Sequence, residues 1–364
     1  MNTVFFAGGG TGGHLMPALA IADAMVRREP SVRPFFVGSY RGVEANVLPQ
    51  RPWPYELLPL EPIRRRQWWK NVGLPLSLAR VLRRSLALIR EQRPRLVVGT
   101  GGYVAGPVVW AALRAGVPAV LQEQNAFPGI ATRRLAKRAR QIHLGFPEAR
   151  RSLRPGPDTI VLDSGNPIQP PPVPRPDRAA ARVGLGLAPD RPTVLVVGGS
   201  QGALAVNRAV DAAVGGGLWP AEVQLVWQTG AGTHGLFANR DDGHRVLVRP
   251  FLDPISDFYA AADLVVSRAG AMTIAELCAW GIPAVLIPLP TAAAGHQLTN
   301  AKALVNAGAA VLLEQRCATG EGLVEAVSAL VSSPARMADL AAAARARARP
   351  EAADSIASAA LQLL

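Results

Sequence analysis

The sequence predicts an α/β protein made of two Rossmann-like domains, each a doubly wound parallel sheet covered by helices. Three observations predict it. Short apolar runs alternate with helix-like runs, the alternation restarts after a proline-rich segment, and each half opens with a glycine turn behind an apolar strand. The length of 364 residues agrees with two domains, because single domains commonly contain about 100–200 residues.

The first half alternates predicted strands with predicted helices. The strands are TVFFA (3–7), RPFFVG (33–38), RLVVG (95–99), PAVLQ (118–122) and QIHLGF (141–146). The helices are expected over 17–28, 43–50, 107–115 and 130–140. This order is typical of a parallel sheet, because each crossover between parallel strands needs a helix or a long loop.

A proline-rich segment, GNPIQPPPVPRPD (165–177), interrupts the pattern and predicts the domain boundary. The second half then repeats the plan, with strands in PTVLVV, VQLVWQTG, HRVLVRPF, ADLVVSRAG and IPAVLIPLP. We expect an N-terminal domain (1–165), a linker (166–177), a C-terminal domain (178–345) and a last helix (346–364). That helix has no strand left to cover, so we expect it to cross back to the first domain.

Composition limits the function classes. The chain is 49% hydrophobic and 18% charged, which indicates folded domains, and its net charge of +13 indicates an anionic partner such as nucleic acid, a lipid surface or a phosphorylated substrate. The two cysteines, Cys278 and Cys317, form no CxxC pair, so we expect a reducing compartment and no thiolate metal site. No signal peptide or spanning segment is evident, so a cytoplasmic protein is expected, at most attached to a membrane.

Three glycine turns are candidate phosphate sites. Gly8, Gly10 and Gly13 satisfy G-x-G-x-x-G, but a dinucleotide-binding domain also needs an acid at the end of the second strand, and Glu44 comes too late. In the second turn, GGSQGA (198–203), Ser200 and Gln201 either bind phosphate and sugar oxygens or cap the next helix.

In the third turn, SRAGAMTIAE (267–276), a helix is expected to begin near Ala271 with free amides that could hold a diphosphate. Glu276 then either accepts hydrogen bonds from a ribose or complements the helix dipole.

Seven motifs follow one another along the chain, across both halves, in this order: GGGTGGH, GTGGYVAGP, EQN, GNP, GGSQGA, SRAGAMTIAE and HQLTNA. With them, essentially the whole chain resembles the MurG family of bacterial N-acetylglucosaminyltransferases. The resemblance implies the GT-B glycosyltransferase fold, with an inter-domain cleft and a C-terminal helix on the first domain. It also implies inverting transfer of GlcNAc from UDP-GlcNAc to undecaprenyl-diphospho-MurNAc-pentapeptide (lipid I), giving lipid II for peptidoglycan.

The resemblance and the turn chemistry together give a set of expected substrate-binding residues. They are Thr11, Gly12, Gly13, Tyr103, Asn125, Gln169, Ser200, Gln201, Leu252, Ala271, Met272, Thr273, Ile274, Ala275, Glu276 and Gln297. Three positions depart from the family pattern. Gln169 stands where the family usually has an arginine, so either a cationic contact is lost or Arg175 or another arginine supplies it. Gln122 replaces a histidine, and His296 replaces one of two glutamines.

An inverting transfer is a single displacement, so it needs a base for the acceptor hydroxyl and stabilisation of the departing UDP. His14 is the expected base, because the positive end of a helix keeps an imidazole neutral; its alternative role is to cap the turn or bind diphosphate. Glu123 is the second candidate base. The sequence contains no Asp-x-Asp pattern, so we expect neither a metal nor a cofactor.

The segment 63–96 has the composition of a membrane contact. Arg65, Arg66, Trp68, Trp69 and Lys70 combine positive charge with interfacial aromatic rings, which suits an anionic lipid surface. The alternatives are a helix packed on the sheet with a solvated arginine face, or nucleic acid, which the two tryptophans beside leucines disfavour.

The expected partners are UDP-GlcNAc, lipid I, an anionic membrane surface and other cell-wall synthesis proteins, with no nucleic acid, at the cytoplasmic face of the inner membrane. The main alternative is another GT-B enzyme that uses a UDP-sugar, such as a UDP-GlcNAc 2-epimerase or a diacylglycerol glycosyltransferase. Two further alternatives are a binding module without catalytic activity and an NADP-dependent reductase.

Overall fold

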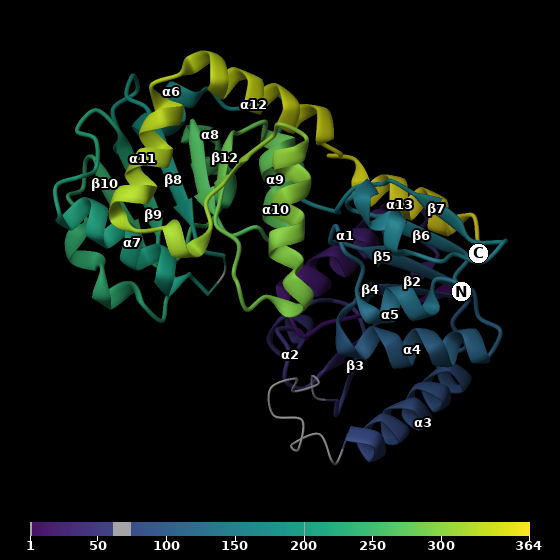
Figure 1. Ribbon diagram of the computed structural model, residues 1–364. Helices are drawn as coiled ribbons and strands as arrows, with labels where there is room; N and C mark the ends of the chain where they lie inside the picture. The colour runs from purple at the N-terminus through teal and green to yellow at the C-terminus, as the bar shows by residue number, and fades with distance from the viewer. Residues whose placement is uncertain (1, 61–73, 200) are drawn as a thin grey trace. The chain divides into compact units, whose positions relative to one another are not determined.

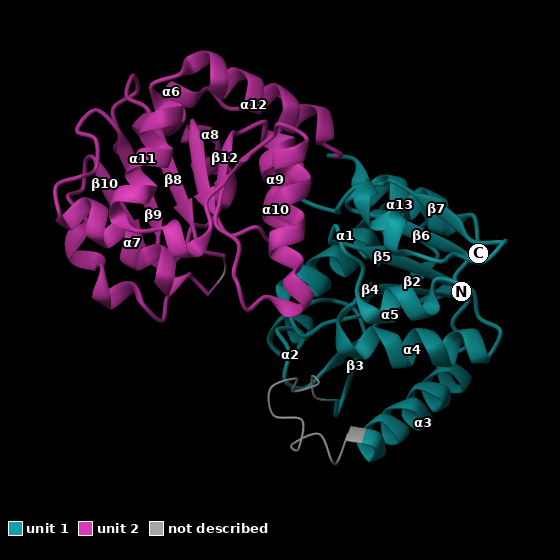
Figure 2. Cartoon of the chain, viewed as in Figure 1, with its two compact units in different colours: residues 1–169, 350–364 teal, residues 170–349 magenta. Residues whose placement is uncertain are grey.

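The computed structural model of the chain describes residues 2–60, 74–199 and 201–364. Its contacts divide the chain into two compact units, coloured separately in Figure 2. Unit 1 contains residues 1–169 and 350–364, and unit 2 contains residues 170–349.

Unit 1 is built on a parallel sheet of seven strands in the order β3-β2-β1-β4-β5-β6-β7 (Figure 1). They are β1 (Asn2–Gly8), β2 (Val32–Ser39), β3 (Tyr55–Leu58), β4 (Leu96–Gly101), β5 (Ala119–Glu123), β6 (Gln141–Leu144) and β7 (Ile160–Leu162). The strand order reverses between β1 and β4. Such a switch point opens a crevice at the carboxyl ends of the strands, where ligands of doubly wound sheets bind.

Helices cover both faces of this sheet. They are α1 (Gly12–Arg28), α2 (Glu44–Val47), α3 (Leu74–Gln92), α4 (Gly102–Arg114), α5 (Ile130–Leu135) and α13 (Ala352–Leu361). Neighbouring side chains of β1 point to opposite faces, as a strand requires. Phe5 stacks on Phe35 in the core shared with α3 and α4, while Phe6 stacks on Phe36 in the core shared with α1 and α13.

Two helices begin earlier than the sequence predicted. The sequence predicted helices that begin at 17 and 107. Instead α1 begins at Gly12 and α4 at Gly102, so Pro17 and Pro107 each lie inside a helix. His14 lies in the first turn of α1, in agreement with its expected position at the positive end of a helix.

Unit 2 repeats the plan with six parallel strands in the order β10-β9-β8-β11-β12-β13. They are β8 (Thr193–Val197), β9 (Gln224–Gln228), β10 (Val246–Arg249), β11 (Leu264–Ser267), β12 (Ala284–Leu286) and β13 (Val311–Leu312). The helices are α6 (Arg178–Gly184), α7 (Leu204–Gly215), α8 (Ile255–Ala261), α9 (Ala271–Trp280), α10 (His296–Asn306), α11 (Gly320–Val331) and α12 (Pro334–Arg347). The switch point lies between β8 and β11.

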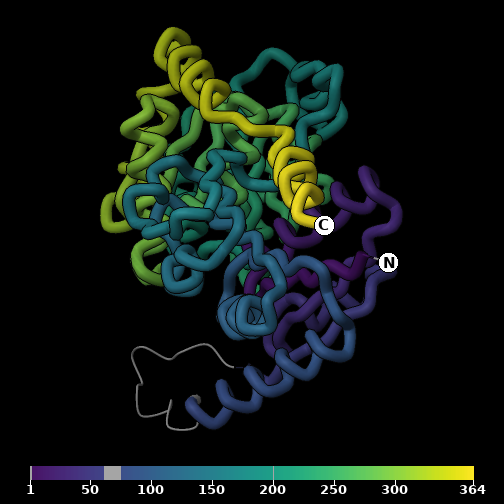
Figure 3. Tube along the Cα trace, turned by 90° about the vertical axis from the view of Figure 1, so that its right-hand side faces the viewer, coloured from purple at the N-terminus to yellow at the C-terminus, as the bar shows by residue number. Residues whose placement is uncertain are grey.

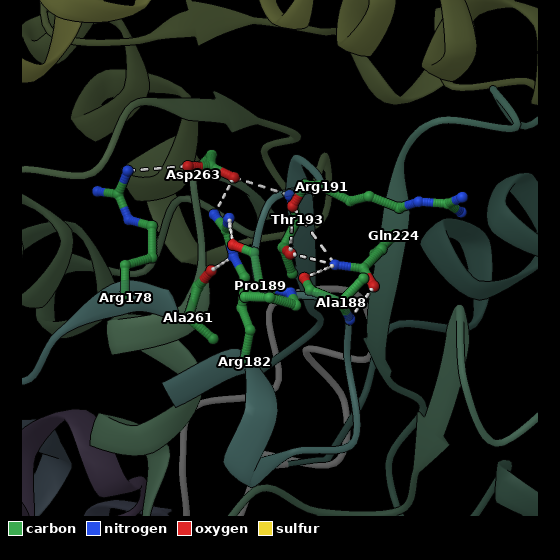
Figure 4. Close-up of polar contacts among 9 residues, drawn as sticks. All are labelled: Arg178, Arg182, Ala188, Pro189, Arg191, Thr193, Gln224, Ala261 and Asp263. Carbon is green, nitrogen blue, oxygen red and sulfur yellow. Dashed lines mark hydrogen bonds and ion pairs between the residues drawn. The ribbon is translucent and has the colours of Figure 1, made fainter. Parts of the chain in front are cut away.

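A polar cluster fastens the amino ends of β8 and β11 (Figure 4). Asp263 accepts hydrogen bonds from Arg178, from the buried Arg182 and, at 2.8 Å, from the backbone amide of Thr193. Arg182 also donates to the carbonyl of Ala261 at 3.0 Å. The charge of this buried arginine is therefore balanced by a carboxylate within its own unit.

The last helix, α13, completes unit 1 (yellow in Figures 1 and 3). It packs against α1 and buries Ile356, Ala357 and Ala360 in the core beneath β1. The side chain of Gln141 donates to the Ala359 carbonyl at 2.9 Å, and Asp354 pairs with Arg28 at 3.2 Å.

The predicted fold class, two Rossmann-like parallel sheets with a last helix returning to the first, is confirmed. No helix in the described ranges is long and apolar enough to cross a membrane.

Candidate active site

The switch point of unit 1 places His14 beside the carboxyl end of β4. Its Nδ1 atom lies 3.1 Å from the carbonyl oxygen of Thr100 and 3.1 Å from Oε1 of Gln124. The Thr100 hydroxyl in turn donates to the His14 carbonyl at 2.8 Å. Gly101 makes this approach possible, because its φ is +99° and a Cβ there would lie 2.8 Å from Nδ1.

The buried carboxylate of Glu44 binds the adjacent glycine loop through the backbone amide of Gly10. Glu44 accepts hydrogen bonds from the backbone amide of Gly10 at 2.9 and 3.0 Å and from the amide and hydroxyl of Ser39 at 2.8 and 2.7 Å. The Tyr103 hydroxyl lies 2.7 Å from Ser39 Oγ. This carboxylate occupies the Gly10 amide, so the loop is not arranged for the pyrophosphate of a dinucleotide.

The second candidate base, Glu123, is saturated with donors. One carboxylate oxygen accepts from the Asn125 amide at 3.1 Å, and the other accepts from the Gly129 amide at 2.9 Å and the Thr132 hydroxyl at 2.8 Å. The side chain is 3% exposed. This arrangement suits a residue that shapes the loop after β5 better than one that takes up a proton.

The switch point of unit 2 opens into a cavity of about 430 Å³. The glycine turn after β8 and the first turn of α9 line it, together with four polar side chains: Arg268, Thr273, Gln297 and Gln315. Neither α7 nor α9 has a side-chain cap at its amino end, and α9 has no acid in its first turn. Two helix starts therefore lie at one pocket, and the amino ends of helices attract anions.

Arg268 is a residue of this pocket that the sequence analysis missed. Its guanidinium donates to the Ile287 carbonyl at 3.0 Å and to Oε1 of Gln315 at 2.7 Å, and the residue is 8% exposed. Burial lowers the pKa of Arg268. Within the described part of the chain no carboxylate pairs with it, in contrast to the buried Arg182. An arginine directly behind an apolar strand at a switch point is the signal that could have found it.

The expected ribose ligand, Glu276, lies on α9 with a hydrogen-bond partner of its own. The Tyr259 hydroxyl donates to Oε2 of Glu276 at 2.9 Å. Burial raises the pKa of Glu276, while the Tyr259 hydrogen bond opposes that shift. Leu252, before the first turn of α8, is 3% exposed.

Gln297 lines the same pocket. Its Oε1 accepts from the Leu289 amide at 2.8 Å, which leaves the amide nitrogen as the donor for a sugar hydroxyl. By contrast, Gln169 is exposed, and Arg175 donates to the Ala279 and Trp280 carbonyls at the end of α9, both at 2.6 Å.

Some expected residues fall outside the described ranges. They are Ser200 and the membrane residues Arg65, Arg66, Trp68, Trp69 and Lys70. Thr11 and Gly13 are exposed, Gly12 is half-buried at the start of α1, and Gln201 is exposed in the second turn. Among the residues placed, no three His, Cys, Asp or Glu side chains group as metal ligands.

Comparison with known proteins identifies the class first. Residues 4–144 match the glycosyltransferase family 28 N-terminal domain, and residues 193–357 match the glycosyltransferase family 28 C-terminal domain. The protein is therefore a glycosyltransferase with two Rossmann-like domains.

The relatives identify the family within that class. The UDP-N-acetylglucosamine--N-acetylmuramyl-(pentapeptide) pyrophosphoryl-undecaprenol N-acetylglucosamine transferase of Chlorobaculum parvum is 39% identical over 97% of both chains. The enzyme of the same name from Desulforudis audaxviator is 40% identical over 97% of this chain and 96% of its own. The crystal structure of MurG from Acinetobacter baumannii superposes with a TM-score of 0.78 at 26% identity, over 99% of each chain. The chain belongs to the MurG family.

Proposed function

We propose that the protein transfers GlcNAc from UDP-GlcNAc to the muramoyl hydroxyl of lipid I, with inversion at the sugar, forming lipid II. Family membership supports the reaction, because the relatives are named for it. The observation that carries the donor assignment is the unit 2 pocket. Its lining in the described residues holds a buried guanidinium and helix amides but no acidic side chain, which suits a diphosphate.

In unit 1, His14 is the base of the proposed reaction. The acceptor oxygen forms a bond to C1 of GlcNAc as its proton passes to Nε2 of His14, and the bond from C1 to the diphosphate oxygen breaks. The two oxygens at Nδ1 support this role, because they leave Nε2 as the nitrogen with a free lone pair. Thr11, Gly12, Gly13, Tyr103 and Asn125 then shape the surface beside it.

In unit 2, the leaving UDP keeps the electrons of the broken bond. Amides at the start of α9, over 271–273, and Arg268 stabilise the charge that develops on the diphosphate. Glu276 accepts from the ribose, Gln297 donates to the GlcNAc hydroxyls, and Leu252 lines the uracil through its backbone. Ser200 and Gln201 complete the contacts from the second glycine turn.

We further propose peripheral attachment to the cytoplasmic face of the inner membrane, since the acceptor is a polyprenyl lipid. On α3, Leu76 and Leu78 are 59% and 38% exposed, and Arg80 and Arg83 of the same helix are exposed. Apolar area beside arginines suits an anionic bilayer surface. Contacts with other cell-wall synthesis proteins would use this same location.

The test is transfer of labelled GlcNAc from UDP-GlcNAc to a short-chain lipid I analogue, with EDTA present, by the wild type and by His14→Ala. We expect metal-independent turnover by the wild type and a loss of about a hundredfold or more in the variant, with UDP binding retained. UDP-GlcNAc binding without transfer would refute the acceptor assignment. Full activity in His14→Ala would leave the reaction in place and remove His14 as its base.

A further inference from the structure

We propose that Gln124 is a positioning residue for His14: its amide, oriented by Gln122 and Asn166, holds the imidazole in the tautomer with the proton on Nδ1 and the lone pair on Nε2. The proposal rests on the proposed function, in which His14 takes the proton of the acceptor.

The partners of His14 determine where its ring proton lies. The Thr100 carbonyl, 3.1 Å from Nδ1, can only accept a hydrogen bond. Oε1 of Gln124, at the same distance, is also an acceptor. Nδ1 must therefore carry the hydrogen, and the neutral ring presents the lone pair of Nε2. Neither partner is titratable, so the tautomer does not depend on the ionisation of either of them.

The orientation of the Gln124 amide follows from its other contacts. Its Nε2 donates to the Thr100 carbonyl at 2.6 Å and also contacts Oε1 of Gln122. Turning the amide over would place its oxygen against these two oxygens, so that orientation is strongly unfavourable. Oε1 is consequently the atom that faces His14.

Gln122 and Asn166 close the network behind Gln124. Gln122 Nε2 donates to Oδ1 of Asn166 at 3.0 Å, and Asn166 Nδ2 donates to the Gln124 carbonyl at 3.0 Å. The three residues are 1–3% exposed, so each amide must be satisfied within the protein. Gln122 departs from the family pattern. Its Oε1 accepts from Nε2 of Gln124, which leaves Oε1 of Gln124 facing Nδ1 of His14.

The first measurement uses the unaltered protein. The chain has five histidines, so ¹⁵N-histidine labelling with His14→Ala for assignment gives the tautomer of His14 directly by NMR. We expect hydrogen on Nδ1 and an unprotonated Nε2. A His14 with its hydrogen on Nε2 would overturn the proposal. This result does not depend on turnover, so it separates the tautomer from the proposed reaction.

The second measurement removes the acceptor oxygen. Gln124→Met keeps the length of the side chain but cannot hold Nδ1–H. We expect kcat to fall about five- to tenfold, with little change in KM for UDP-GlcNAc. In the His14→Ala background the same substitution should have no further effect on the residual rate, because Gln124 acts through His14.

A matched control lies on the adjacent strand. Gln141 is also buried, and its Oε1 lies 3.2 Å from Nε2 of His143. Gln141→Met removes the same group beside another histidine and should leave kcat unchanged. Equal losses in the two variants, or an equal loss from Gln124→Met without His14, would show a merely structural role and refute the proposal.

Discussion

The phenolic hydroxyl of Tyr259, on α8, lies 2.9 Å from Oε2 of Glu276, on α9, and donates a hydrogen bond to it. Tyr259 is 2% exposed, and both burial and the adjacent carboxylate hold its pKa well above the ordinary value. The hydroxyl therefore stays protonated and fixes one oxygen of Glu276, which leaves the other oxygen for the ribose that we propose Glu276 binds.

The first prediction is that Tyr259→Phe weakens UDP-GlcNAc binding by about tenfold, the value of one hydrogen bond to a charged group. The pH dependence should change as well. Burial raises the pKa of Glu276 and the tyrosine opposes this, so removal of the hydroxyl raises that pKa further. Affinity is lost as pH falls through the pKa of Glu276, so in the variant the loss begins at a higher pH. Calorimetric titration across pH checks both statements, and an unchanged pH profile would contradict the second.

The second prediction concerns Arg268, whose buried charge has no carboxylate partner among the described residues. Arg268→Met should weaken UDP binding by about ten- to a hundredfold but leave uridine binding nearly unchanged, since only UDP carries the diphosphate. Arg316→Met is the matched control, because Arg316 is 80% exposed and pairs with Glu314. Equal losses for UDP and uridine would show that Arg268 supports the pocket rather than the anion.

The third prediction concerns the carboxylate beneath the first glycine loop. Glu44→Gln keeps one acceptor oxygen for Ser39 but places an NH2 donor against the Gly10 amide, so the free energy of unfolding should fall by about 2–3 kcal/mol. Urea denaturation measures it. Glu91→Gln, at the exposed pair with Arg84, should change stability by less than about 1 kcal/mol. Similar losses in the two variants would contradict a special role for Glu44.

The fourth prediction tests the lipid surface on α3. Replacing Leu76 and Leu78 together with serine should reduce binding to vesicles of anionic phospholipid by about tenfold or more, because both leucines would lose apolar contact with the bilayer. Leu236→Ser is the control, since Leu236 is 67% exposed but lies in unit 2. Co-sedimentation measures binding. Unchanged binding in the double variant would place the lipid contact elsewhere.

Much of the fold could be predicted from the sequence, because strand–helix alternation and glycine turns are local signals. The start of α9 at Ala271 follows from Gly270 alone. Arg268, Tyr259 and Glu44 were not recognised, because their roles depend on partners distant in the chain. Gln315 lies 47 residues after Arg268, and Gly10 lies 34 residues before Glu44. The starts of α1 and α4 were predicted too late, at Pro17 and Pro107, because both helices contain a proline in their second turn.

The return of α13 to unit 1 has a consequence for synthesis on the ribosome. The part of the unit 1 core that α13 covers beside α1 stays open to water until Ile356 and its neighbours emerge, long after residue 169. At a translation rate of about 5–20 residues per second, unit 2 is completed during that interval of roughly ten to forty seconds. The nascent first domain must survive this delay with part of its apolar core exposed, and a chain that ends before α13 would keep that surface exposed and be prone to aggregate.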